Sequence, residues 1–209
     1  MSIHAHPLLA RRPHRETLAL ALDPGGAPDI ALALARLHEA TGTARHSFAA
    51  WLAARLDGPV FWIAPHWAQA WLNPQGLADF TRPGQFTFIA PDRAADILWC
   101  MEEALRAGLV PLVVADLAEL PALTPVRRLH LAAETGAQTT GQAPLGLILT
   151  PGPGGAPGVE SRWQMEPAHT PRKPGWTLTR LRARTAPLKH WHVGLKDGRF
   201  STTPALQDG

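Results

Sequence analysis

The first 150 residues alternate short apolar runs with stretches in which apolar residues recur at helical spacing. The clearest helical stretch follows Asp92, where one stripe of apolar side chains repeats every three to four residues. The predicted helices are 45–57, 92–108 and 124–136. The predicted strands are 34–41, 59–64, 85–90, 109–115 and 144–150. This alternation predicts an α/β fold with a mostly parallel sheet that helices cover on both faces.

Residues that start or stop helices support these boundaries. Asp92 is an expected N-cap, and Gly108 stands at the expected C-terminal stop of the same helix. Thr124-Pro125 has the form of a cap followed by a first-turn proline, which predicts a helix start. We expect that last helix to end at Gly136.

The pattern changes after Thr150. The segment 151–158, PGPGGAPG, predicts a flexible break. Three stretches of alternating apolar and polar residues follow it, at 161–165, 176–184 and 190–195. We therefore predict four parts: a flexible leader over 1–28, an α/β core over 29–150, an antiparallel extension over 151–198 and a disordered tail over 199–209.

Composition narrows the class of protein. Hydrophobic residues make up 45 % of the 209 residues, enough for a sizeable core in one domain. No apolar run is long enough to span a membrane, and the start of the chain lacks the features of a secretory signal. Cys100 is the only cysteine, which excludes an internal disulfide and a cysteine zinc cluster. We therefore expect a cytoplasmic protein with no membrane association.

The distribution of charge is more informative than the formal net charge of +3. Residues 160–200 hold nine basic and three acidic residues, and the first 15 residues hold three arginines and no acid. Both ends are therefore basic around a mildly acidic body. Such flanks attract nucleic acid or an acidic protein surface, and a solvated arginine-rich surface is an equally open interpretation.

The order of the predicted elements resembles the RecA core. The segment LHEATG at 37–42 is similar to the strand that leads into a recombinase phosphate loop. The stretch 61–77 is similar to the second strand and the turn that follows it. The helix at 91–108 and the strand ending at Asp116 are similar to the elements around a Walker B aspartate.

Within that superfamily the chain resembles the ImuA family. Five weak motifs in the right order, over about residues 35–193, carry this resemblance. They are Leu37-His38-Glu39, Leu72-Asn73-Pro74, the stretch from Trp99 to Arg106, the stretch RRLHLAAE at 127–134, and Arg162-Trp163.

The resemblance implies both a fold and a function. The fold would be a RecA-like three-layer α/β/α arrangement with a degenerate nucleotide site. The function would be that of a non-catalytic accessory protein in the SOS response, acting in DNA-damage-induced translesion mutagenesis. Its partners would be an inactive Y-family polymerase relative (ImuB) and an error-prone C-family DNA polymerase, at the nucleoid when engaged. Because the family is related to SulA-type division inhibitors, a regulator that binds RecA or a cell-division protein is the alternative.

Residue chemistry argues against nucleotide hydrolysis. A phosphate loop needs glycines, a lysine that reaches the outer phosphate oxygens, and a Ser or Thr hydroxyl for magnesium. Here only Gly42, Arg45 and Ser47 remain of such a loop, and Pro65-His66 stands where recombinases carry a catalytic glutamate. Asp116 is either a magnesium ligand or a strand-end cap, and we favour the cap. We therefore expect no enzyme activity, no catalytic residue and no cofactor, with an active nucleotidase as the contrary hypothesis.

Tryptophan and arginine together suggest where partners bind. Trp51, Trp62, Trp71 and Trp99 have core spacing. Trp67 and Trp71 flank a short loop, where partial exposure is the expectation. The candidate partner or single-stranded DNA contacts are Trp163, Trp176, Arg180, Arg182, Arg184 and Trp191. The alternative is a small sheet with its tryptophans inside and its arginines outside.

Other chemistry is weakly supported. The pairs His4/His6 and His190/His192 each place two rings on one strand face, but no third ligand is near, so we expect no metal site. Ser47 has no nucleophile-elbow context, which argues against a hydrolase triad. Cys100 is expected to belong to the core.

Overall fold

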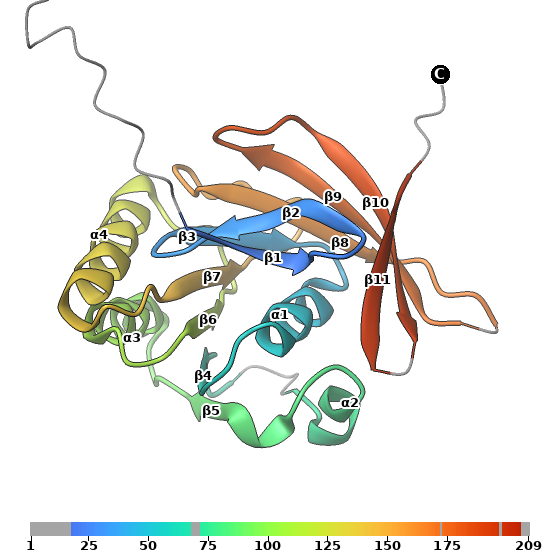
Figure 1. Ribbon diagram of the computed structural model, residues 1–209. Helices are drawn as coiled ribbons and strands as arrows, with labels where there is room; N and C mark the ends of the chain where they lie inside the picture. Colours follow the sequence, from blue (N-terminus) through green and yellow to red (C-terminus); the bar gives the residue numbers. More distant parts are fainter. Residues whose placement is uncertain (1–17, 68–71, 172, 197, 206–209) are drawn as a thin grey trace, which may run out of the picture.

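The structure is a computed structural model that describes residues 18–67, 72–171, 173–196 and 198–205 (Figure 1). A nine-stranded sheet runs through it. The strand order is β11-β10-β9-β8-β3-β7-β6-β4-β5. The central strands are β3 (Leu37–Thr41), β4 (Val60–Ile63), β5 (Phe86–Ile89), β6 (Leu112–Asp116) and β7 (Leu145–Leu149). The later strands are β8 (Ser161–Pro167), β9 (Gly175–Ala183), β10 (Lys189–Lys196) and β11 (Arg199–Pro204).

Most of the sheet is parallel, as the sequence predicts. The five pairs from β8 through β3, β7, β6 and β4 to β5 are parallel. The three pairs among β8, β9, β10 and β11 are antiparallel. The chain is therefore an α/β protein whose parallel sheet continues into an antiparallel extension.

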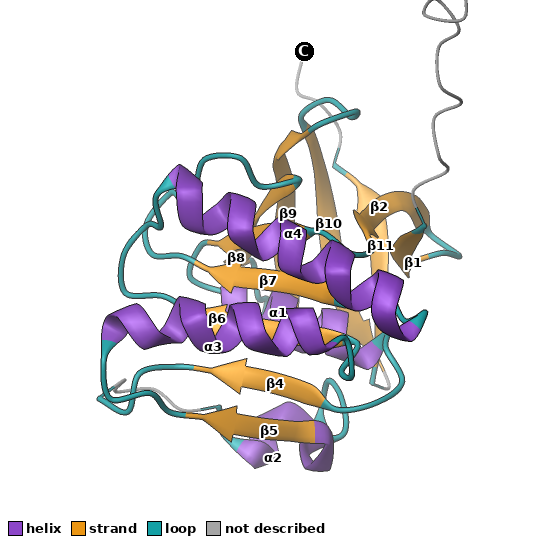
Figure 2. Cartoon of the chain, turned by 90° about the vertical axis from the view of Figure 1, so that its left-hand side faces the viewer, coloured by secondary structure: helices purple, strands orange, loops and turns teal. Residues whose placement is uncertain are grey.

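Helices lie against both faces of the parallel strands. The helices are α1 (Arg45–Ala54), α2 (Pro74–Ala78), α3 (Ala94–Ala107) and α4 (Leu123–Thr140), with a 3-10 turn η2 at Pro83–Gln85. Figure 2 shows α3 and α4 side by side in front of the sheet, with α1 behind it. Strand residues alternate accordingly: Val113 and Ile148 pack under α3 and α4, whereas Val114 and Leu147 pack toward α1. Among the described helices, none combines the length and apolar character that a membrane crossing requires.

A hairpin replaces part of the predicted leader. Strands β1 (Ala19–Asp23) and β2 (Ala27–Ala33) form a separate antiparallel pair. Leu22, Ile30 and Leu32 on this hairpin are fully buried in the α1-side core. The prediction of a loose leader was therefore wrong for residues 18–28, because alternating apolar residues in both arms give the hairpin one face to bury. Residues 1–17 lie outside the described part of the chain.

The predicted tail is also partly structured. Residues 199–204 form β11, which pairs with β10 over six positions. The ring of Phe200 stacks on Trp51 at a centroid distance of 4.8 Å. The sequence prediction missed this strand because its stabilising partner, Trp51, is about 150 residues away in the chain. Residues 206–209 are not described.

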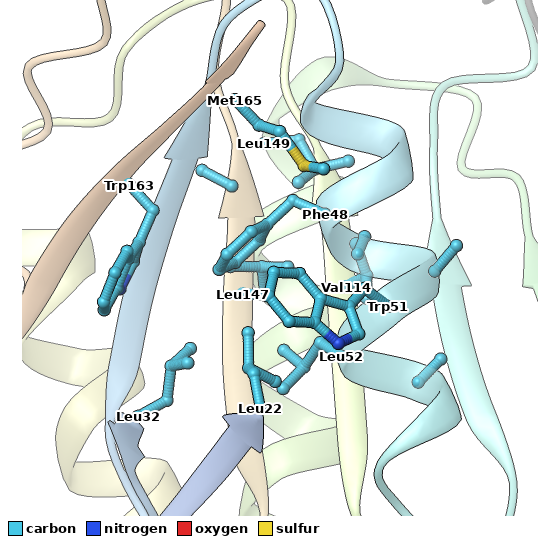
Figure 3. Packing of buried hydrophobic residues seen from close by; sticks show 14 of the residues in the cluster. Leu22, Leu32, Phe48, Trp51, Leu52, Val114, Leu147, Leu149, Trp163 and Met165 are labelled. Carbon is cyan, nitrogen blue, oxygen red and sulfur yellow. The ribbon is translucent and has the colours of Figure 1, made fainter. Parts of the chain in front are cut away.

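One core joins the parallel strands to the extension (Figure 3). The α1-side cluster contains Phe48 and Trp51 of α1 together with Trp163, Trp176 and Trp191 of the extension. The Phe48 and Trp163 rings stack at 6.0 Å, and Trp163 lies 5.9 Å from Trp191. The predicted boundary at 150/151 therefore does not separate two cores, and the change of strand direction comes later, between β8 and β9.

Several helix ends differ from the predictions. Helix α1 ends at Ala54 and not at 57, and α4 begins at Leu123 after an Ala122 N-cap, so Thr124 is not its cap. Helix α3 ends at Gly108 as predicted, with the left-handed φ of 64° that glycine favours, but its N-cap is Arg93 and not Asp92. Helix α4 continues past Gly136 and stops at Gly141. A Cβ atom on Gly136 would lie 2.2 Å from the Leu105 carbonyl oxygen. Gly136 therefore permits the close approach of α3 and α4 and does not end the helix.

Candidate functional site

The β3–α1 loop and the start of α1 contain the residues predicted from the sequence to form a degenerate phosphate loop. Only Gly42, Thr43 and Ala44 connect the last residue of β3 to the first of α1. Gly42 has a φ of +89°, and a Cβ atom there would meet the Met165 carbonyl oxygen at 2.4 Å. The turn therefore requires glycine for a tight connection against β8.

Two backbone donors of this loop, the N–H groups of Thr43 and Ala44, are already bonded within the chain. The Thr43 N–H donates to the Glu166 carboxylate at 3.0 Å, and the Thr43 hydroxyl donates to the same oxygen. The Ala44 N–H donates to the Met165 carbonyl oxygen at 3.0 Å. The hydroxyl and N–H of Thr43 lower the pKa of the Glu166 carboxyl below its ordinary value. A carboxylate from β8 thus occupies the start of α1, where the helix dipole favours an anion.

Asp116 is bound by the first turn of α1. Its carboxylate accepts a hydrogen bond from His46 Nε2 at 2.7 Å, and Arg45 Nε lies 3.8 Å away. This differs from the predicted strand-end cap, because the partners belong to α1 and not to the turn after β6. Ser47 follows in the same turn and is half-buried. The structure therefore gathers the four predicted residues of the degenerate loop, Gly42, Arg45, Ser47 and Asp116, at the carboxyl end of the sheet.

The charges of this cluster compensate one another. Asp116 faces both Arg45 and His46, and the three side chains are largely buried. The His46 ring also lies 5.7 Å from that of Trp62. The positive charge that Arg45 could offer an incoming anion is thus directed at a carboxylate of the same chain.

A second, buried ion pair was not predicted from the sequence. Glu39 on β3 is fully buried and pairs with Arg162 Nε on β8. Its other oxygen accepts hydrogen bonds from Thr150 Oγ1 at 2.7 Å, the Gly155 N–H at 2.8 Å and the Ala156 N–H at 3.1 Å. These bonds hold residues 151–158 against the ends of β3 and β7, which corrects the prediction of a flexible break. Both partners of the pair belong to motifs noted in the sequence, Leu37-His38-Glu39 and Arg162-Trp163. The sequence contains no indication that the two motifs are in contact.

Two histidines connect the same motifs. His38 is buried, accepts from the Ser161 hydroxyl at 2.7 Å and donates from Nε2 to the Ala33 carbonyl at 2.9 Å. His130 of α4 accepts from the Leu37 N–H at 3.3 Å and donates to the Gly158 carbonyl at 3.1 Å. Burial lowers the pKa of His38 to about 4 and also lowers the pKa of His130. Both imidazoles therefore serve as neutral connectors at pH 7.

The tryptophans expected to contact partners are inside the molecule. Trp163, Trp176 and Trp191 are at most 4 % exposed. Arg180 is buried with them: its guanidinium carbon lies 5.2 Å from the Trp191 ring centroid, and Nη1 donates to the Asp29 carbonyl at 2.9 Å. These four residues are therefore corrected from contact candidates to core residues. Burying the three indole rings stabilises the fold through the hydrophobic effect, which exposed rings would not do.

The remaining candidates and aromatic residues are distributed differently. Arg182 and Arg184 are exposed, and Arg184 Nε lies 3.6 Å from Glu160. Trp51 and Trp62 are in the core as predicted, and Trp67 is half exposed, whereas Trp99 is 58 % exposed and not in the core. Cys100 is half-buried beside the α3-side core. Trp71 and the pair His4/His6 fall outside the described residues.

The outer face of the extension is polar. Gln164, Thr179 and His190 share one row of the sheet, and the next row contains Glu166, Thr177 and His192. His190 Nδ1 and Thr179 Oγ1 are hydrogen-bonded at 2.9 Å. Within the described ranges, no three His, Cys, Asp or Glu side chains gather as a metal site would require.

Comparisons with known proteins do not assign the chain to a family. No protein-family model matches the chain, and no curated protein matches it. The functional argument therefore depends on the residues and contacts above.

Proposed function

We propose that this chain is a non-catalytic protein-binding scaffold with a RecA-like three-layer α/β/α arrangement. By its resemblance to the ImuA family, it would serve DNA-damage-induced translesion mutagenesis. Its partners would be an ImuB-type polymerase relative and an error-prone C-family DNA polymerase. RecA is a further candidate partner because of the same resemblance, and single-stranded DNA is one because both ends of the chain are basic.

The order of the elements supports the RecA-like part of the proposal. A parallel strand leads through a tight glycine turn into α1, and β6 ends in Asp116 beside the start of that helix. Antiparallel strands then extend the sheet on the side of β3. This order agrees with the one expected from the resemblance.

The observation that carries the non-catalytic part is the occupied start of α1. A phosphate bound there would need the Thr43 and Ala44 N–H groups, which already bond Glu166 and Met165. It would also face the negative charge of the Glu166 carboxylate. A phosphate would have to displace Glu166 from the N–H and hydroxyl of Thr43. The geometry therefore favours a loop bound by Glu166 over a nucleotide site.

A nucleotide assay on the full chain tests this proposal. We expect no saturable binding of a fluorescent ATP analogue with Mg²⁺, and no phosphate release with or without single-stranded DNA. Glu166→Gln keeps a hydrogen-bond acceptor at Thr43 but removes the charge, and we expect it to remain inactive. Phosphate release above background that disappears in Asp116→Asn would overturn the proposal.

A binding assay addresses the partners. Truncation after residue 158 is unsuitable because it removes Trp163 and Trp191 from the core. Instead, Arg182→Glu and Arg184→Glu are compared with Arg82→Glu, whose side chain is 74 % exposed elsewhere on the chain. We expect weaker capture of an ImuB-type partner by at least one of the first two variants. Filamentous cells on overexpression without DNA damage would instead favour a division protein as the target.

A further inference from the structure

A groove beside α4 is unused by the site described above. It has a volume of about 480 Å³. We call it the α4 groove. Its lining residues are Leu123, Arg127, His130, Leu131 and Glu134 of α4, with Arg36, Gly158 and Arg184 opposite. Leu123, Arg127 and Leu131 are four apart, so they form one stripe along the helix.

Two exposed leucines stand on the α4 side of the groove. Leu123 is 38 % exposed and Leu131 62 % exposed. Leu123 lies over the 151–158 segment, since a Cβ atom on Gly158 would be 2.9 Å from Leu123 Cδ1. Leu120 continues the strip over Gly155 and is also half exposed. These exposed leucines stand on both sides of Arg127 and offer apolar contacts to a molecule that lies in the groove.

The charged part of the groove has a positive excess. Arg36 pairs with Glu134 and lies 3.8 Å from Glu160, which also faces Arg184. Arg127 has no acidic group within ion-pair distance in the part of the chain that the structure describes. Its neighbour Arg128, by contrast, binds Glu102 at 2.8 Å. Arg127 is thus left to pair with an acidic group from outside the chain.

The base of the groove is held in place by hydrogen bonds. His130 bridges the Leu37 N–H and the Gly158 carbonyl, so both of its ring nitrogens are used. Burial lowers its pKa and keeps the ring neutral at pH 7, so the positive excess comes from the arginines. A groove with a fixed base loses little conformational entropy when a partner binds.

We propose that the α4 groove docks an acidic amphipathic segment of a partner protein, with leucine-like side chains on Leu123 and Leu131 and carboxylates on Arg127 and Arg184. This rests on the proposed role as a protein-binding scaffold and names the chemistry of the partner. A nucleic acid fits less well, because the groove offers leucines where base stacking needs aromatic faces. A free anion would use the arginines and leave the leucines exposed.

The test uses a fluorescein-labelled 16-residue peptide with leucines at helical spacing and glutamates between them. Two comparison probes are the same peptide with serine for leucine, at equal charge, and inorganic phosphate. The full-chain variants are Arg127→Glu and Leu131→Ser, which avoid Arg184 because it also enters the partner assay above. Arg82→Glu and Leu109→Ser are matched controls, since Leu109 is 72 % exposed away from the groove.

We expect the leucine peptide to bind and each groove variant to weaken binding by about tenfold, with the controls within about twofold. Equal binding of the serine peptide, displacement by phosphate, equal effects in the control variants, or no binding at all would overturn the inference. Unchanged thermal unfolding of the two exposed-site variants shows that they remain folded. Failure here leaves the nucleotide assay as the separate test of the non-catalytic scaffold.

Discussion

At the scale of single residues, Glu39 shows how the described motifs depend on one another. A fully buried carboxylate is costly unless it is paired and hydrogen-bonded, and Glu39 meets this requirement with Arg162, one hydroxyl and two N–H groups. The same interactions join β3, β8 and the 151–158 segment. Removing either charge leaves the other buried without a partner.

We therefore predict that Glu39→Ala lowers the free energy of unfolding by about 3–5 kcal/mol, measured by urea denaturation. Glu103→Ala is the matched control, because Glu103 pairs with Arg106 on the surface of α3. Its expected effect is about 0.5 kcal/mol or less. Equal losses in the two variants would contradict a structural role for the buried pair.

A second prediction at this scale concerns pH. His38 has its pKa lowered to about 4 in the folded protein, against 6.5 for the free side chain. Between these values the unfolded chain binds a proton that the folded chain does not, so stability present above pH 6.5 is lost as pH falls toward 4. The loss at His38 amounts to about 3 kcal/mol, and His130 acts in the same direction. Urea denaturation between pH 7.5 and 4.5 should show this loss, and His38→Gln should reduce the slope.

At the scale of elements, the crossing of α3 and α4 depends on Gly136. Gly136 packs against the end of α3. A Cβ atom on Gly136 would lie 3.0 Å from the Cα atom of Gly108, in addition to its contact with the Leu105 carbonyl oxygen. An intrahelical glycine is normally unfavourable, and its presence here is explained by the contact between the two helices.

We predict that Gly136→Ala destabilises the protein by about 1–3 kcal/mol despite the higher helix propensity of alanine. Gly76→Ala is the control, because Gly76 is also helical and its Cβ atom would have only Asn73 Cβ nearby, at 3.9 Å. Thermal and urea unfolding should show no loss of stability for this control. A stabilised Gly136→Ala would show that the two helices can separate without cost.

At the scale of the whole molecule, the parallel sheet and its antiparallel extension share one hydrophobic cluster. Aromatic side chains from α1, β8, β10 and β11 stack into a single cluster, and the β1–β2 hairpin covers it. Asp23 of the hairpin also accepts hydrogen bonds from the N–H and hydroxyl of Thr202 on β11. The two ends of the described chain therefore stabilise each other.

We predict that the full chain unfolds in one transition, with tryptophan fluorescence and far-ultraviolet circular dichroism changing together. A fragment of residues 1–158 should lack a cooperative transition, because it loses Trp163, Trp176 and Trp191 from the core. A fragment that unfolded as sharply as the full chain would restore the predicted boundary at 150/151.

The local pattern of residues determined the elements of the parallel part. Helical spacing predicts α3, apolar runs predict β6 and β7, and Gly108 marks a helix end, because each of these depends on residues close together in the chain. The missing lysine and glycines of the β3–α1 loop are likewise visible in the residues themselves.

Only the tertiary structure decided what fills that loop and which surfaces remain free. Glu166 reaches Thr43 from 123 positions away, and Phe200 meets Trp51 across the core. The three late tryptophans are inside because β8, β9 and β10 place them in the same cluster as α1. The physical reason is that strand pairing and side-chain burial join residues distant in the chain, so neither the occupant of a site nor the exposure of a ring follows from its sequence neighbours.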